Sequence, residues 1–158
     1  YFGKEVLEQV DEDAVIENVQ AIRKFAGDRA VLRAFHFFEE NKRVDAEVEA
    51  LESKDFATFL RKVTESGDSS WKWLQNCYCN ETPDEQSITV ALALTKLYLD
   101  KIGHGVCRVH GGGFAGVIAA FLPKEYTEGF TAYIDKALGA GSAYVMHIRP
   151  QGAIKVEL

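Results

Sequence analysis

The spacing of the apolar residues changes at Gly103, and this change sets the fold class. Before Gly103 the apolar residues recur at steps of three and four, the period of a helix with one buried face. After it, short apolar or alternating segments end at glycine or proline, as strands do. Strands gathered in one part of a chain favour an α+β fold, in which helices cover one face of a largely antiparallel sheet.

Three or four helices are predicted before Gly103, and Asp28 and Asp55 stand where two of them begin, as short acceptor side chains do at helix N-caps. An acidic helix start is also predicted at 11–13, and a surface loop at Cys77–Glu85. The first helix has Val15, Val19, Ile22 and Phe25 on one face and ends at Gly27, and the second has Val31, Phe35, Phe38, Val44, Val48 and Leu51 on its buried side, with a break or bend near Asn41. The third has Phe56, Phe59, Leu60 and Val63 at helical spacing and continues through Trp71 and Leu74 if Gly67 does not interrupt it. The fourth is Gln86–Ile102, with Ile88, Leu92, Thr95 and Leu99 on one face.

Four strands and one further helix are predicted after Gly103. The strands are Val106–Val109, Val117–Leu122, Ala143–Ile148 and Ala153–Val156. The helix follows Pro123, which a first helical turn tolerates, and it ends at Gly139. We expect these elements to form one domain over residues 1–158.

Composition excludes several classes of partner. The chain has 158 residues, of which 47% are hydrophobic, and its longest apolar run has six residues, against roughly 18 or more for a membrane span. The formal charge is −6, and the first 55 residues carry all of it, with 14 acidic and 8 basic residues; the other 103 hold ten of each. Because no basic stripe is present, we expect neither nucleic acid nor a membrane as partner.

The sulfur-containing residues indicate a reducing compartment and a longer protein. Cys77, Cys79 and Cys107 are an odd number in a domain large enough to fold without disulfides, so we expect free thiols and a cytoplasmic location. Their spacing with the nearby histidines matches no common zinc pattern, so no metal site is expected. The only methionine is Met146; translation therefore did not begin at Tyr1, and we expect this chain to be part of something longer.

Six of the 13 glycines fall within fourteen positions, and this density has two explanations. The six are Gly103, Gly105, Gly111, Gly112, Gly113 and Gly116. Consecutive glycines adopt positive φ and let their N–H groups form a concave anion-binding nest. The alternative is a sharp turn between two strands that binds nothing, and spacing alone leaves both open.

Two known phosphate-binding loops are excluded. Residues 111–116 match G-x-G-x-x-G, but a dinucleotide-binding loop opens a helix of several turns, and here only six residues separate Gly116 from Pro123. A Walker A loop requires Lys followed by Ser or Thr, which this segment lacks.

Residues 108–116, Arg-Val-His-Gly-Gly-Gly-Phe-Ala-Gly, closely resemble the third, C-terminal motif of galactokinases, members of the GHMP family of small-molecule kinases. The resemblance continues through residues 29–52, 55–59, 65–70 and 139–152, nearly the whole chain. It implies a GHMP C-terminal domain with a ferredoxin-like antiparallel sheet layer. It also implies an enzyme that uses ATP and Mg to phosphorylate galactose at its anomeric hydroxyl, giving galactose 1-phosphate.

The resemblance implies a glycine loop that lines the nucleotide and sugar cleft. The matching positions are Gly111, Gly112, Gly113, Phe114 and Gly116, with Arg108 and His110 as cleft-side candidates. The family's sugar signature, main ATP loop, catalytic Asp and catalytic Arg lie in the N-terminal domain, which this chain lacks. We therefore expect no catalytic residue and no bound cofactor here, an inactive isolated chain, and the N-terminal domain and a sugar as partners.

Two departures from the family pattern leave the sugar open. Ala115 stands where the family has glycine, and Ser66-Gly67 where it has a Ser-His pair. A non-catalytic, sugar-sensing or regulatory galactokinase-like module is the alternative function. The residues that match the upstream Asp and Arg would decide between the two.

Overall fold

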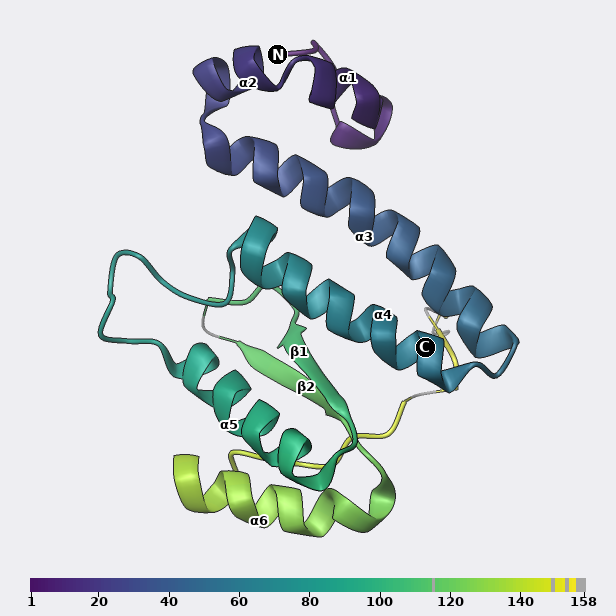
Figure 1. The fold of residues 1–158 in the computed structure, drawn as a ribbon, viewed down its shortest axis with the longest axis vertical. Helices are drawn as coiled ribbons and strands as arrows, with labels where there is room; N and C mark the ends of the chain where they lie inside the picture. The colour runs from purple at the N-terminus through teal and green to yellow at the C-terminus, as the bar shows by residue number, and fades with distance from the viewer. Residues whose placement is uncertain (115, 149, 153, 156–158) are drawn as a thin grey trace. The chain divides into compact units, whose positions relative to one another are not determined.

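The fold is α+β, as expected, with six α-helices and one pair of antiparallel strands among the described residues (Figure 1). The computed structural model describes residues 1–114, 116–148, 150–152 and 154–155. The chain divides into two compact units, residues 1–122 and 123–158. No described helix is long and apolar enough to cross a membrane.

The first predicted helix is two helices, α1 (Glu12–Glu17) and α2 (Val19–Ala26). The acidic start is confirmed, because the Asp11 side chain accepts a hydrogen bond from the Asp13 amide at 2.8 Å. The prediction for Phe25 was wrong: it is 70% exposed. The helix breaks at Asn18, whose side chain donates a hydrogen bond to the Ala14 carbonyl at 2.9 Å. Phe25 lies in the last turn of α2, one residue before its end.

Helix α3 (Asp28–Glu52) runs without a break through Asn41, where a break or bend was predicted. Its N-cap is Gly27, and Asp28 is instead the first helical residue, with its carboxylate 2.6 Å from the Arg23 guanidinium. The prediction that the later apolar residues of this helix lie on its buried side was also wrong. Those three residues are about half exposed: Val44, Val48 and Leu51.

A one-residue rotation explains the misassigned face of α3. The buried residues in its second half are Arg43 and Ala50, seven positions apart on one face of the helix. Arg43 is buried because it pairs with Glu40, a carboxylate that also bonds a side chain of the neighbouring helix. An ion pair between buried Arg43 and half-buried Glu40 therefore occupies the face where an apolar stripe was expected.

Helix α4 (Phe56–Ser69) begins as predicted at Asp55, which accepts a hydrogen bond from the Thr58 amide at 3.0 Å. Gly67 does not interrupt it. An added Cβ there would lie 3.1 Å from the Arg108 Cβ, so glycine allows the helix to approach the first strand closely. The chain then continues into a π-helical turn, Ser70–Leu74.

The predicted loop and the next helix are both confirmed. Residues 77–85 contain no helix or strand, and α5 (Ser87–Ile102) follows. Ile88, Thr95 and Leu99 are buried on one face of α5, and the helix ends at Gly103, which adopts the left-handed conformation with φ of +74°.

The described residues form two of the four predicted strands. These are β1 (Val106–His110) and β2 (Val117–Phe121), antiparallel with Val106 opposite Phe121. Residues 143–148 form no strand: they have no ladder partner among the residues that the structure describes, and Ile148 is 88% exposed. The fourth predicted strand begins at Ala153 and ends at Val156, and both of these lie outside the described residues.

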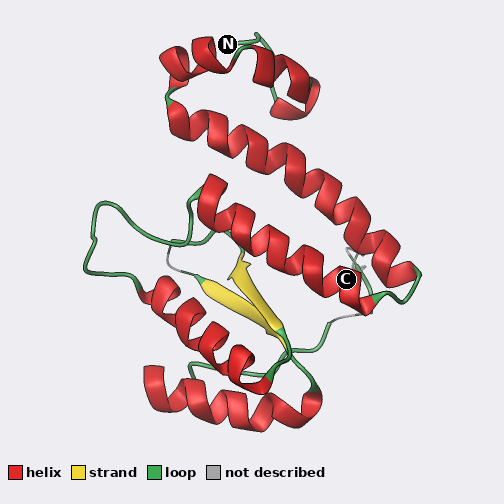
Figure 2. Ribbon diagram, in the orientation of Figure 1, coloured by secondary structure: helices red, strands yellow, loops and turns green. Residues whose placement is uncertain are grey.

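Helices pack on both faces of β1 and β2, where one covered face was predicted (Figure 2). The ring of Phe59 on α4 meets that of Phe121 at 5.9 Å. Phe121 pairs with Val106, so Val109, three residues along β1, points to the other face. There it packs with Ile88 of α5 in a buried cluster. The strand pair therefore lies between two helices.

A second cluster of buried residues holds the N-terminal helices to α3, and it consists of Val15, Ile22 and Val31. In the unit formed by residues 123–158, a 3₁₀ turn (Lys124–Tyr126) leads into α6 (Thr127–Leu138). Phe130 and Ile134 are buried there, and Gly139 ends the helix as predicted.

Candidate functional site

The glycine loop, residues 111–116, joins the end of β1 to the start of β2. Gly111 has φ of +72° and Gly113 of +75°, whereas the φ of Gly112 between them lies outside the left-handed region. Gly111 and Gly112 are exposed, and a Cβ added at either would meet nothing within 4 Å. At these two positions the loop therefore presents main chain at the surface.

Phe114 follows the three glycines in a conformation that a bulky residue rarely adopts. Its φ is +58°, and its side chain is 46% exposed. Left-handed backbone costs an aromatic residue about 1–3 kcal/mol unless surrounding contacts hold it. The Phe114 amide donates a hydrogen bond to the Asn76 carbonyl at 2.7 Å.

Asn76 is the residue beneath the glycine loop, and sequence reasoning missed it. It is 1% exposed. Its side-chain amide donates to the Gly112 carbonyl at 3.2 Å. A Cβ on Gly113 would lie 2.2 Å from the Asn76 carbonyl oxygen, so only glycine fits at that point of the loop. Asn76 lies at the edge of the predicted 77–85 loop, where no spacing pattern marks it.

The end of the π-helical turn holds Asn76 in place. Gln75 has φ of +58° and reverses the chain. Its amide donates to the Ser70 carbonyl at 2.8 Å, and its carbonyl accepts from the Arg29 guanidinium at 2.8 Å. Asn76 is thus held by its bond to the Ser70 carbonyl in the π-helical turn and by the contacts of its neighbour Gln75 with that turn and with α3, none of which involves the glycine loop.

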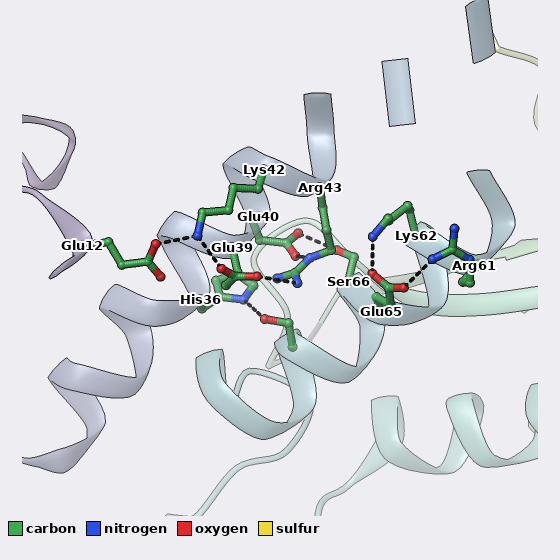
Figure 3. Close-up of polar contacts among 11 residues, drawn as sticks. Glu12, His36, Glu39, Glu40, Lys42, Arg43, Arg61, Lys62, Glu65 and Ser66 are labelled. Atoms are coloured by element: carbon green, nitrogen blue, oxygen red, sulfur yellow. Dashed lines mark hydrogen bonds and ion pairs between the residues drawn. The ribbon is translucent and has the colours of Figure 1, made fainter. Parts of the chain in front are cut away.

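Arg108 joins β1 to the two long helices. Its Nη1 lies 2.5 Å from the Ser66 hydroxyl on α4, which in turn donates to Glu40 on α3 at 2.5 Å. Arg43 donates to the other oxygen of Glu40 at 2.5 Å, and Figure 3 shows Glu40 beside Arg43 and Ser66. The Arg108 Nε bonds the Val109 carbonyl at 2.9 Å, two residues before the glycines.

The charges around Glu40 stabilise its carboxylate. Burial opposes its ionisation, but the hydrogen bonds from Ser66 and Arg43, with the charges of Arg43 and Arg108, outweigh it and hold the pKa of Glu40 below its ordinary value. Burial lowers the pKa of His36, whose Nδ1 is hydrogen-bonded to the Ser69 hydroxyl on α4. The arrangement of a half-buried carboxylate between two arginines fixes α3, α4 and β1 together.

The structure brings some of the predicted site residues together and separates others. Four of them follow one another in the loop, Gly111 to Phe114, and Gly116 is exposed at its far end. His110, the last residue of β1, is exposed. Arg108 is occupied by Ser66 and Glu40 between the helices. Ala115, the departure from the family pattern within the loop, lies outside the described residues.

The glycine loop itself carries no titratable side chain. Backbone N–H groups are neutral donors that suit an anion without changing protonation state. Among the residues that the structure describes, no group of three His, Cys, Asp or Glu side chains is placed to hold a metal ion. The three cysteines are unpaired, and burial raises the pKa of the Cys77 and Cys107 thiols.

Comparison with known proteins agrees with the motif. No family model matches the chain. A galactokinase of Actinobacillus pleuropneumoniae is 30% identical over 128 residues, which cover 81% of this chain and 31% of that protein. A galactokinase of Glaesserella parasuis has the same identity and coverage. This chain is a relative of the galactokinases. A galacturonokinase of Arabidopsis thaliana is 32% identical over 102 residues, 65% of this galactokinase-like chain and 22% of the plant protein.

The galactokinase-like chain spans about 31% of the length of the bacterial relatives that it matches. The relatives are sugar kinases by name.

Proposed function

We propose that this chain is the C-terminal domain of a longer galactokinase-like sugar kinase that transfers the γ-phosphoryl of Mg-ATP to the anomeric hydroxyl of galactose. The glycine loop lines the cleft that holds the phosphates and the sugar. The kinase relatives support the reaction class, and galactose is favoured because bacterial relatives with that name align with 81% of the chain.

The observation that carries this proposal is the backbone of the glycine loop. The sign of φ alternates from Gly111 through Gly112 to Gly113, and such alternation turns successive N–H groups toward one concave side. The two exposed glycines leave room for a phosphate oxygen to approach the main chain. Strain at Phe114 in the same loop is typical of a binding site.

The chemistry of phosphoryl transfer determines which groups this chain supplies and which the rest of the longer protein must supply. The reaction depends on positioning and on stabilisation of charge by Mg²⁺, cations and N–H donors. The loop supplies neutral N–H donors, which suit phosphate oxygens. We assign the base, the Mg²⁺ ligands and the sugar-binding side chains to the rest of the longer protein, its N-terminal domain. The three unpaired cysteines favour the cytoplasm as its location.

The test is a coupled assay of the longer protein with Mg-ATP and either galactose or galacturonic acid. We expect ATP-dependent formation of galactose 1-phosphate, with slower turnover of galacturonic acid. If the protein phosphorylates galacturonic acid and not galactose, the substrate is galacturonic acid and the proposal of galactose is wrong. Binding of galactose without phosphate transfer would replace the kinase with the sugar-sensing alternative.

A further inference from the structure

We propose that Asn76 is a positioning residue for the glycine loop, holding its amides in the conformation that receives phosphate. This inference rests on the proposed function. Asn76 does not touch the reacting atoms in this proposal; it acts through the loop. Three kinds of contact, made by one buried residue 36 positions away in the sequence, carry the argument.

The first contact fixes Gly112. The Asn76 side-chain amide donates to the Gly112 carbonyl at 3.2 Å. A peptide unit is planar, so a bond to the carbonyl of Gly112 also sets the direction of the next N–H, that of Gly113. That N–H is one of the donors assigned to phosphate, and Asn76 orients it from the opposite end of the same peptide.

The second contact fixes Phe114. The Asn76 carbonyl accepts the Phe114 amide at 2.7 Å, while Phe114 keeps a left-handed φ of +58°. Strained backbone persists only where its surroundings over-determine it. The bonds to Gly112 and Phe114 hold the chain on both sides of Gly113, so the loop has little freedom to relax.

The third contact is steric. Gly113 passes so close to Asn76 that an added Cβ would lie 2.7 Å from both Cγ and Nδ2 of its side chain. Gly113 therefore packs directly against the Asn76 carboxamide. Asn76 is itself held by the neighbouring Gln75, whose carbonyl bonds Arg29 of α3. Asn76 is therefore held in place independently of the glycine loop, and its contacts determine the conformation of that loop.

The near-isosteric variant Asn76→Asp tests this role. It keeps the backbone carbonyl and an acceptor oxygen for the Cys77 thiol, but it replaces the donor to Gly112 with an oxygen that repels that carbonyl. Asn76→Ala removes both side-chain interactions. Val31→Ala is the matched control, because Val31 is buried in the separate cluster around α1 and α2.

The first measurement is amide hydrogen exchange in the 158-residue chain. We expect both Asn76 variants to speed exchange of the Phe114 amide, which is bonded to the Asn76 carbonyl, about tenfold, the scale of one lost hydrogen bond, while Val31→Ala leaves this amide unchanged. Unchanged loop exchange in folded Asn76→Asp would overturn the inference. If Asn76→Ala fails to fold, the Asp variant still decides it.

The second measurement is steady-state kinetics in the longer kinase. We expect the KM for Mg-ATP to rise about tenfold in Asn76→Asp and the KM for galactose to change less, a split that simple loss of folded protein does not produce. Unchanged kinetics with a loosened loop would overturn the positioning role. If the wild-type protein has no kinase activity, the proposed function fails, and the exchange measurement alone decides whether Asn76 holds the loop.

Discussion

Gly112 and Gly113 are adjacent, yet the structure gives them opposite tolerance for a side chain. A Cβ at Gly112 meets open space, and its φ is one that any residue adopts. Gly113 combines a φ of +75° with a contact of 2.2 Å to the Asn76 carbonyl. Glycine is therefore present at the two positions for different reasons: Gly112 leaves an open surface, and Gly113 allows a close approach to Asn76.

We predict that Gly113→Ala destabilises the chain by about 2–4 kcal/mol, because it adds backbone strain to a clash with main chain. The matched variant Gly112→Ala should stay within about 0.5 kcal/mol of wild type. Urea unfolding of the three proteins measures both values. Equal stabilities for the two variants would show that Asn76 does not press on Gly113.

Glu40 makes a pH-dependent contribution to stability. Because its folded pKa lies below the ordinary value, its ionised form stabilises the fold above that value, and this contribution is lost as the pH falls through the folded pKa. We predict that Glu40→Gln costs about 2 kcal/mol at neutral pH, since charged hydrogen bonds to Ser66 and Arg43 are lost.

The loss in Glu40→Gln should shrink as the pH is lowered from about 7 to about 3, because the wild-type carboxylate is then protonated as well. Free energies of unfolding across this range test the sign. Exposed Glu52 on the same helix supplies the control Glu52→Gln, for which we expect little change. A gap that widens in acid would contradict the assigned direction of the pKa shift.

At the level of elements, the structure follows local rules where they act within one segment. Asp11 and Asp55 both cap helices as their positions predicted, and α5 buries the predicted face. Predictions from one segment alone fail where contacts between segments determine which face is buried or whether a strand forms. The pair of buried Arg43 and half-buried Glu40 rotates the inner face of α3 by one residue. The apolar segment at 143–148 forms no strand, because it has no ladder partner in the described part of the chain.

The cap of α4 gives a prediction at this scale. Asp55→Ala removes the acceptor for the Thr58 amide and should cost about 1 kcal/mol. Asp45→Ala removes an exposed acidic side chain from within α3 and should cost much less. Thermal or urea unfolding compares them, and equal losses would mean that the cap contributes nothing beyond the removal of a charge.

For the molecule as a whole, the sequence predicted the position of the glycine loop but not what supports it. The motif marked residues 111–116 and their setting between two strands, and the structure confirms both flanking strands. Asn76 and the Arg108–Ser66–Glu40 chain were missed, because each joins residues distant in the sequence through single contacts that no spacing reveals.

The chain alone should not transfer phosphate. It spans about 31% of its bacterial relatives, and the groups that phosphoryl transfer requires besides N–H donors are assigned to the rest of the protein. We predict no galactose 1-phosphate from the purified 158-residue chain with Mg-ATP and galactose, by the same coupled assay. Turnover by this chain would show that its catalytic groups have been missed.

The most direct test of the account compares the wild-type longer protein with its Gly112→Val variant in ATP-dependent phosphorylation of galactose. Valine at this open position should leave the fold nearly intact, because nothing lies within 4 Å of its Cβ, but it blocks the approach of phosphate to the main chain. We predict an active wild type and a loss of about 100-fold in kcat/KM with near-normal unfolding. Unchanged kcat/KM in the folded variant would contradict a glycine loop that lines the cleft.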